Sequence, residues 1–89
     1  MEFNINDYVY INDSAQEDIC LFAWDYIKKT RVGRVRGVLD PDAKNKLEMQ
    51  YAVEFKDTFE GGHTCKNICQ PRMGQFITAK HLQLVENYA

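Results

Sequence analysis

Hydrophobic and polar positions alternate most regularly between residues 47 and 56. Every second residue of this segment is apolar, and four of the five residues that alternate with them are polar; the apolar positions are Leu47, Met49, Tyr51, Val53 and Phe55. Side chains of a β-strand point alternately to its two faces, so this pattern is typical of an antiparallel strand with one buried face. It predicts a strand over residues 47–56, which the polar turn 40–46 joins to an earlier strand.

Four shorter segments have the apolar, β-branched or aromatic residues of strands: 8–11, 32–39, 74–79 and 82–85. Gly33 and Gly37 interrupt the second of these segments. Glycine inside a strand usually marks a bend or a close approach of another backbone. Residues 79–81 are expected to form a single helical turn before the last strand.

Residues 15–29 have the spacing of a helix. Their apolar side chains recur three or four residues apart and would form one stripe: Ile19, Phe22, Ala23, Tyr26 and Ile27. Ser14 followed by Glu17 is the pattern of a capping box at a helix start. We therefore expect a helix over residues 15–29 that buries Phe22 and Tyr26. Trp24 lies off the centre of the stripe and is expected either beside the core or partly exposed.

Composition limits the class of protein. The chain has 89 residues, of which 45% are hydrophobic, and this fits one folded domain over residues 1–89 with little room for a deep substrate pocket. No apolar run approaches the length of a membrane span, and the first residues lack the features of a signal peptide. Three cysteines, an odd number, argue against a disulfide framework. A non-enzymatic, cytoplasmic protein without membrane contact is expected.

The segment 57–73 has no hydrophobic period, yet it concentrates residues that can do chemistry. Residues 61–69 hold two glycines, one histidine and two of the three cysteines. Connections this long in a compact domain are usually functional or are held by their own contacts. This segment is therefore the first place to look for a site.

Three residues of this segment are candidate metal ligands, namely His63, Cys65 and Cys69. Cys20 or His81 would be a distant fourth, because structural zinc is commonly held by four nitrogen or sulfur ligands. A catalytic thiol would use His63 as its base, but the sequence marks neither a third member nor an oxyanion hole. We favour buried structural thiols and a histidine that hydrogen-bonds loop backbone, and we expect no cofactor.

Charge is segregated along the chain, although the net charge is only −2. Residues 1–25 carry six acidic and no basic side chains, whereas residues 26–36 carry five basic and no acidic ones: Lys28, Lys29, Arg31, Arg34 and Arg36. This basic segment could follow a phosphate backbone, with Tyr8 and Tyr10 nearby for stacking. The alternative is a solvated face that pairs with Glu48 and Glu54 across the hairpin. The acidic surroundings weaken the field of the segment.

Five short strands with a one-turn helix before the last resemble the layout of small Src-homology-3-like (SH3-like) barrels, as in the Tudor and KOW families. The resemblance rests on residues 32–35 with 51–55, and on the ending 76–85. It implies a mainly β fold, a five-stranded small SH3-like barrel with the helix 15–29 inserted after the first strand. It implies no activity, because such barrels have many functions.

A narrower likeness concerns the loop. Val53-Glu54-Phe55 followed by Gly61-Gly62-His63, Cys65 and Cys69 is similar to small barrel proteins of bacteriophages and their hosts. The chain departs from that pattern at Phe76, where the family often has tryptophan. The likeness implies an origin in a mobile element.

Together these features predict a non-enzymatic binding module, a phage-type accessory protein that binds and modulates a host protein. The expected contact surface combines the 57–73 loop with the adjoining helix: Trp24, Phe59, His63 and Arg72. Aromatic and arginine side chains are frequent anchors of such interfaces. The alternative is an RNA- or DNA-binding barrel that uses the basic segment, and an enzyme comes third.

Overall fold

The structure is a computed structural model that describes residues 2–86. Five strands, one α-helix and three 3-10 helices follow one another: β1 (Tyr8–Ile11), η1 (Asp13–Asp18), α1 (Leu21–Thr30), β2 (Val32–Val38), η2 (Lys46–Glu48), β3 (Gln50–Glu54), β4 (Gly74–Thr78), η3 (Ala79–His81) and β5 (Leu82–Leu84). The expected small, mainly β protein with a helical turn before its last strand is confirmed. No helix within these residues has the length and apolar character needed to cross a membrane.

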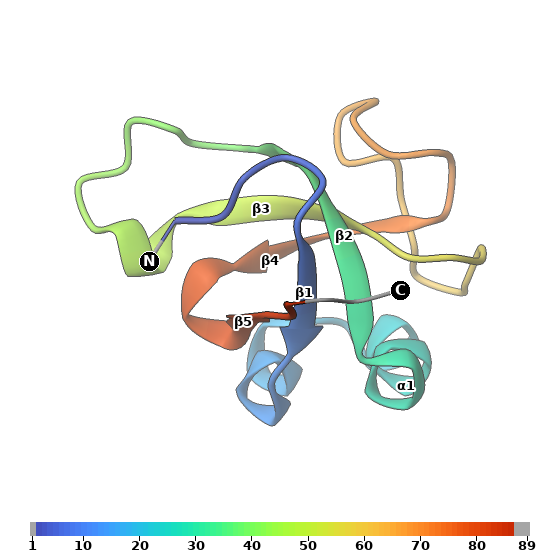
Figure 1. Cartoon of the computed structure of the whole chain (residues 1–89). Coiled ribbons are helices and arrows are strands. Elements are labelled where there is room, and N and C mark those ends of the chain that lie inside the picture. Colours follow the sequence, from blue (N-terminus) through green and yellow to red (C-terminus); the bar gives the residue numbers. More distant parts are fainter. Residues whose placement is uncertain (1, 87–89) are drawn as a thin grey trace.

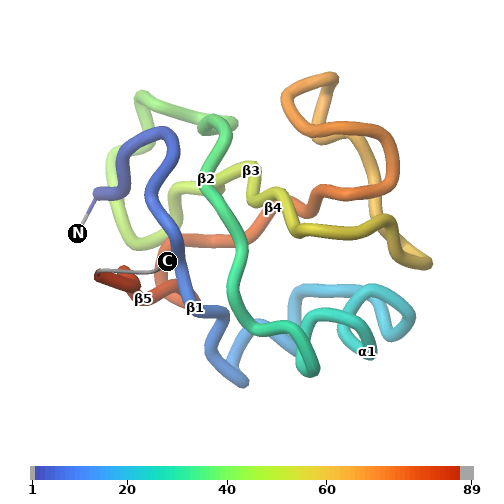
Figure 2. The backbone as a smooth tube through the Cα atoms, turned by 45° about the vertical axis from the view of Figure 1, so that its right-hand side comes forward, coloured from blue at the N-terminus to red at the C-terminus, as the bar shows by residue number. Residues whose placement is uncertain are grey.

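The five strands form one antiparallel sheet in the order β4-β3-β2-β1-β5. The first and last strands are therefore neighbours, with Tyr10 opposite Gln83. Figure 1 shows η1 and α1 (light blue to green) at one end of β1 and β2. The connections 39–48 (green) and 57–73 (orange) lie on opposite sides of β2, as Figure 2 shows. The two long connections are thus separated by β2.

The strand predicted from strict alternation is confirmed, but it is shorter than expected. Met49, Tyr51, Val53 and Phe55 are all buried, as the alternation requires. Leu47 is exposed because it belongs to η2, where its backbone N–H donates to the side chain of Asn45. β3 proper therefore spans Gln50–Glu54.

The two glycines of β2 mark a close approach and a bulge. A β-carbon on Gly33 would lie 2.4 Å from Cγ1 of Val53, so only glycine lets these strands come so close. The register between β2 and β3 shifts between Val35 and Gly37, which is a β-bulge. Simple alternation predicts Val35 and Val38 on opposite faces. Because of the bulge both pack against the core.

The prediction of one helix over residues 15–29 is wrong. Residues 13–18 form η1, Cys20 and Ile19 are extended, and α1 begins at Leu21. Ser14 does not cap the helix, because its hydroxyl is hydrogen-bonded to Nδ1 of His81 at 2.8 Å. A contact distant in sequence therefore replaces the local capping box.

The break at Cys20 also changes which side of the helix is buried. α1 buries Ala23, Trp24 and Ile27, whereas Phe22 is 58% exposed. Ile19 and Phe22 would lie on the same face only if the chain between them were continuous helix. Because Ile19 and Cys20 are extended, Phe22 no longer lies on the face of Ile19. The expected burial of Phe22 is wrong, while Tyr26 is half-buried against the core.

Candidate functional site

The connection 57–73 contacts β3 and β4 through part of its length. His63 exchanges two backbone hydrogen bonds with Gly74, of 3.0 and 2.9 Å, and so pairs with β4 on the edge that faces away from β3. Cys65 and Cys69 form a second small apolar cluster with Ala52 and the partly buried Phe76. The loop therefore has its own core, separate from the main one.

The tip of this loop is a tight left-handed turn. Cys65, Lys66 and Asn67 have φ angles of 51°, 57° and 69°, a conformation that costs free energy in residues other than glycine. Two backbone hydrogen bonds close the turn, from Ile68 N–H to the carbonyl of Cys65 at 3.2 Å and from Cys69 N–H to that of Thr64 at 2.8 Å. Lys66 and Asn67 are left exposed at the tip.

His63 holds the loop backbone, as the sequence led us to favour. Its Nδ1 accepts a hydrogen bond from the backbone N–H of Cys65 at 3.1 Å. His81, one of the proposed distant ligands, is bound instead to Ser14 and Asp18. Within residues 2–86, no three His, Cys, Asp or Glu side chains come together in a way that could hold a metal ion.

The two loop thiols lie together and differ in acidity. Cys65 has no exposed surface and Cys69 is 6% exposed, and neither is in a disulfide. A hydrogen bond between the two side chains, together with burial, raises the pKa of Cys65 far above its ordinary value. The same bond, helped by the positive charge of Arg36, lowers the pKa of Cys69. Cys69 is therefore the more acidic thiol of the pair.

The predicted partner surface does not exist as one surface. Trp24 is only 4% exposed and Phe59 is also buried, with the Phe59 ring stacked on Tyr26 at a centroid distance of 4.5 Å. His63 and Arg72 are exposed. The loop and helix do meet, but they do so by burying their aromatic residues in each other. The expectation that Trp24 and Phe59 contact a partner is corrected.

An exposed apolar pair lies at the start of α1 instead. Leu21 is 66% exposed and Phe22 is 58% exposed. Asp25 lies four residues after Leu21 and three after Phe22 in the same helix, so it shares their face. Glu17 and Asp18 precede the pair in η1 and are exposed. Sequence reasoning missed this pair because it assumed an unbroken helix, in which Phe22 points to the core.

The basic segment is largely engaged within the protein. The Arg31 guanidinium donates to the carbonyls of Lys28 and Ile11, at 2.9 Å each, and also pairs with Asp13. It lies over the rings of Tyr10 and Trp24, 5.6 and 5.3 Å from their centroids. Arg31 is thus a structural residue that joins β1 to the end of α1.

The remaining bases differ in their partners. Lys28 pairs with Asp25 at 3.3 Å, and Arg36 donates to Oδ1 of Asn6 at 2.9 Å. Lys29 is exposed. Arg34 lies over the ring of Tyr8, 5.4 Å from its centroid, and its buried Nε has no hydrogen-bond partner among residues 2–86.

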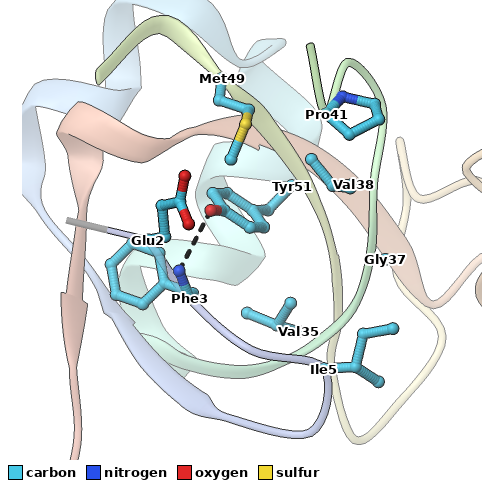
Figure 3. A pocket seen from close by; sticks show the side chains of 9 residues that line it. All are labelled: Glu2, Phe3, Ile5, Val35, Gly37, Val38, Pro41, Met49 and Tyr51. Atoms are coloured by element: carbon cyan, nitrogen blue, oxygen red, sulfur yellow. Dashed lines mark hydrogen bonds between the residues drawn. The ribbon is translucent and has the colours of Figure 1, made fainter. Parts of the chain in front are cut away.

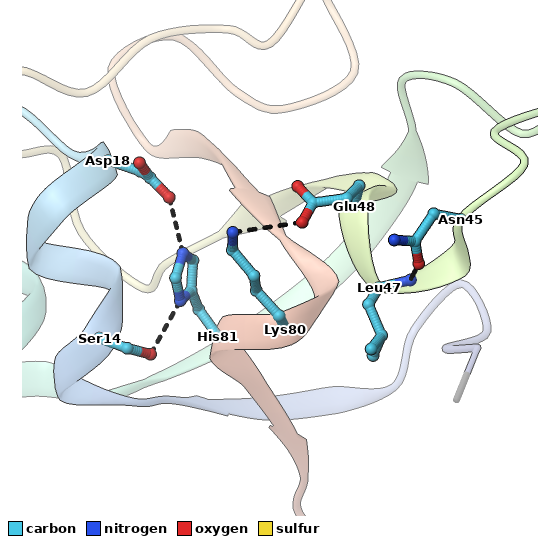
Figure 4. A network of polar contacts seen from close by, with 7 residues as sticks. All are labelled: Ser14, Asp18, Asn45, Leu47, Glu48, Lys80 and His81. Carbon is cyan, nitrogen blue, oxygen red and sulfur yellow. Dashed lines mark hydrogen bonds and ion pairs between the residues drawn. The ribbon is translucent and has the colours of Figure 1, made fainter.

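Glu48 and Glu54 do not form the expected ion pairs with the bases of the neighbouring strand. Glu54 stands opposite Arg34 in the sheet register, but its carboxylate accepts from the backbone N–H of Gln70 at 2.8 Å. Glu48 pairs with Lys80 at 3.3 Å, as Figure 4 shows. The two acids therefore hold the loop and η3 in place.

Three hollows are open on the described surface. One of about 200 Å³ lies under the N-terminal segment, where Phe3 and Tyr51 meet edge to face and Phe3 N–H donates to the Tyr51 hydroxyl at 3.1 Å (Figure 3). A second of about 230 Å³ lies beside Arg34, and a third of about 450 Å³ lies between Leu47 and Leu84. The first two are smaller than typical small-molecule sites.

A serine, a histidine and an aspartate form one chain of hydrogen bonds (Figure 4). The His81 ring is buried, with Nδ1 bonded to Ser14 at 2.8 Å and Nε2 to Asp18 at 2.7 Å. A serine hydrolase has the reverse arrangement, with the carboxylate on Nδ1 and the serine on Nε2. None of the three hollows includes Ser14. We interpret this chain as a structural link between η1 and η3.

No protein-family model, no curated protein and no solved structure matches this chain. Its function is therefore inferred from geometry and charge.

Proposed function

We propose that this protein is a small SH3-like barrel that works as a non-enzymatic binding module for a protein partner. The strand order supports the barrel: β1 pairs with both β2 and β5, and the one-turn helix η3 joins β4 to β5. That layout resembles the small barrels of the Tudor and KOW families. The assignment to bacteriophage accessory proteins that modulate a host protein stays a prediction from the loop sequence.

One observation carries the proposed binding role. Leu21 and Phe22 are adjacent, lie on the first turn of α1, and are each more than half exposed. Exposed aromatic and large aliphatic side chains placed together are typical of protein interfaces. α1 buries Ala23, Trp24 and Ile27 against the core, so Leu21 and Phe22 lie on the side of the helix that faces solvent.

Charge identifies the kind of partner. Glu17 and Asp18 precede the apolar pair in η1, and Asp25 follows it on the same face of α1. Asp18 also bonds His81 and Asp25 also pairs with Lys28, the first basic residue of the chain. An apolar patch with an acidic rim is complementary to an apolar anchor flanked by lysine or arginine. We therefore expect the partner to present a basic segment with at least one large apolar side chain.

A library of displayed random peptides tests this role. Peptides are selected on the wild-type protein and then measured on the Leu21→Ala/Phe22→Ala double variant. We expect peptides that combine apolar and basic residues, with a Kd at least about tenfold weaker on the double variant, equivalent to about 1.4 kcal/mol. Leu47→Ala is the matched control, because Leu47 is 54% exposed on η2, and it should leave the Kd unchanged.

The same selection can overturn the proposal. Selected peptides that bind the double variant as well as the wild type would exclude the α1 surface. Peptides enriched in acidic residues would exclude the charge argument. Equal melting temperatures of the wild type and both variants establish that a loss of binding does not come from unfolding.

A second candidate function is nucleic-acid binding by β2. The observation in its favour is Arg34, which lies over Tyr8 and has no ion pair within residues 2–86. Arg36 and the exposed Lys29 would extend this surface, while Arg31 and Lys28 are already engaged.

Titration of single-stranded RNA and DNA against salt tests the second candidate. Binding should weaken linearly with the logarithm of salt concentration, and Arg34→Ala or Arg36→Ala should each reduce the slope by about 0.7 for a single strand. Lys44→Ala, an exposed base in the 39–48 connection, is the control. Absence of binding at low salt would exclude this function.

A further inference from the structure

The structure places two thiols in contact inside the 57–73 loop. We propose that Cys65 and Cys69 form a reversible intrachain disulfide when hydrogen peroxide oxidises the protein, with Cys69 attacking first and Cys65 resolving. This modification site shares no residue with the Leu21 and Phe22 surface of α1 and is independent of the proposed binding role.

Backbone geometry brings the two cysteines together. The hydrogen bonds from Ile68 to Cys65 and from Cys69 to Thr64 close the turn between them. Disulfides require Cα atoms within about 7 Å, and a closed turn of this length meets that need. Both side chains lie in one small buried cluster with Ala52, and the hydrogen bond between them is the largest cause of both pKa shifts, so the disulfide needs no rearrangement of the sheet.

Gly74 fixes the position of the Cys69 sulfur. A β-carbon at Gly74 would lie 2.7 Å from both Cβ and Sγ of Cys69 and 2.9 Å from the carbonyl oxygen of His63. Only glycine in β4 leaves this space, and the thiol fills it. The Cys69 side chain is therefore held on the Cys65 side of the loop.

Exposure and charge assign the two roles. Cys69 is slightly exposed and Cys65 is fully buried, so an oxidant reaches Cys69 first. The hydrogen bond from Cys65 lowers the pKa of Cys69 and outweighs burial and the Glu54 carboxylate, which oppose it, while Arg36 lowers the pKa slightly further. A thiolate is the reactive form of cysteine. Cys65, which keeps its proton, supplies the second thiol.

The chemistry balances in two steps. The Cys69 thiolate attacks one peroxide oxygen, the O–O bond breaks, and a sulfenic acid forms while hydroxide leaves and takes up a proton as water. The Cys65 sulfur then attacks the sulfenic sulfur, the S–O bond breaks, and the departing hydroxide takes the Cys65 proton as a second water. Two electrons pass from the sulfurs to peroxide.

Peptide mapping tests the proposal with the wild-type protein. Trypsin cleaves after Lys56, Lys66 and Arg72, so Cys65 and Cys69 fall in separate peptides, 57–66 and 67–72. After peroxide treatment and alkylation of remaining thiols, we expect these two peptides joined by a disulfide. The intact protein should lose two hydrogen atoms in mass, and dithiothreitol should restore both free thiols.

Variants test the roles and the specificity. Cys65→Ala should leave a sulfenic acid on Cys69 that dimedone traps, whereas Cys69→Ala should give no dimedone adduct at Cys65. Cys20→Ser removes the exposed third cysteine and should leave the joined peptides unchanged. If Cys65→Ala or Cys69→Ala fails to fold, the tryptic peptide maps of the wild type and of Cys20→Ser still show whether the Cys65–Cys69 disulfide forms.

Three results would overturn the proposal. The first is that both loop cysteines escape oxidation, and are therefore still alkylated, at a peroxide dose that oxidises glutathione in the same tube. Cys69 could instead accumulate as sulfinic acid without a joined peptide. Disulfides found only between Cys20 residues of two molecules would show that the loop pair is inert.

Discussion

His81 Nε2 and the carboxylate of Asp18 are hydrogen-bonded at 2.7 Å, although the two residues are 63 positions apart in the chain. The other ring nitrogen is bonded to Ser14. One buried ring therefore ties both ends of η1 to η3, the turn between the last two strands. The ring thereby joins the helical insertion to the closing part of the sheet, together with the backbone bond from Asn12 N–H to the His81 carbonyl at 2.8 Å.

Removing the His81 ring should destabilise the whole domain. His81→Ala leaves a cavity and two unpaired polar side chains, so we expect the free energy of unfolding in urea to fall by about 2–4 kcal/mol. Ser14→Ala removes only one hydrogen bond from an exposed side chain and should cost about 1 kcal/mol or less. Equal losses for the two variants would contradict the role of the ring as the link.

Two neighbouring aromatic residues of α1 should respond in opposite ways to truncation. Trp24→Ala should cost about 3–5 kcal/mol of unfolding free energy, because Trp24 is buried beneath Arg31. Phe22→Ala should change stability by no more than about 0.5 kcal/mol, because Phe22 is exposed. Chemical denaturation of both variants measures the difference. A large loss for Phe22→Ala would show that this side chain is packed rather than available to a partner.

The two glycines of β2 should differ in their tolerance of alanine. At Gly33 a β-carbon would meet Val53 at 2.4 Å and the Glu54 carbonyl oxygen at 3.2 Å, so Gly33→Ala should destabilise by about 1–3 kcal/mol through overpacking. At Gly37 it would meet only the Ile68 side chain, at 3.0 Å or more. Ile68 is partly exposed and can move, so Gly37→Ala should cost less than Gly33→Ala in the same denaturation experiment. The reverse order would mean that the β2–β3 spacing is not tight at Gly33.

The thiol pair should make stability depend on alkaline pH. Cys69, whose pKa is lowered in the folded protein, adds stability as pH rises towards the ordinary thiol value of 9.0. Cys65 has a raised pKa, so above 9.0 the unfolded chain loses a proton that the folded chain keeps, and stability falls. Urea unfolding under reducing conditions between pH 7 and 10 measures this. The Cys65→Ala/Cys69→Ala variant measures the pH dependence that comes from tyrosine and lysine. If its unfolding free energy varied with pH in the same way as that of the wild type, the pKa shifts assigned to the two thiols would be contradicted.

The local patterns of the sequence determined the strands and the turn before the last one. Alternation along residues 49–55 specified a buried face, and the glycines of β2 correctly indicated a close approach and a bend. These features follow from the period of a strand and from the space that a side chain occupies, both of which are set within a few residues. The role of His63 in holding loop backbone was likewise within reach of local reasoning.

Only the tertiary structure decided the course of the chain between β1 and β2. The helix breaks at Cys20, Ser14 binds His81 rather than its own helix, Phe22 is exposed instead of buried, and Trp24 takes the core position among its two expected ones. The contacts responsible join residues that lie far apart in the sequence, and no local period contains them. The same holds for the loop, where Ala52, Gly74 and Phe76 bury the two thiols that spacing alone presents as metal ligands. A side chain contributes to the core or stays available to a ligand according to its burial and its hydrogen-bond partners. Both depend on which distant segments of the chain lie beside it in the folded protein.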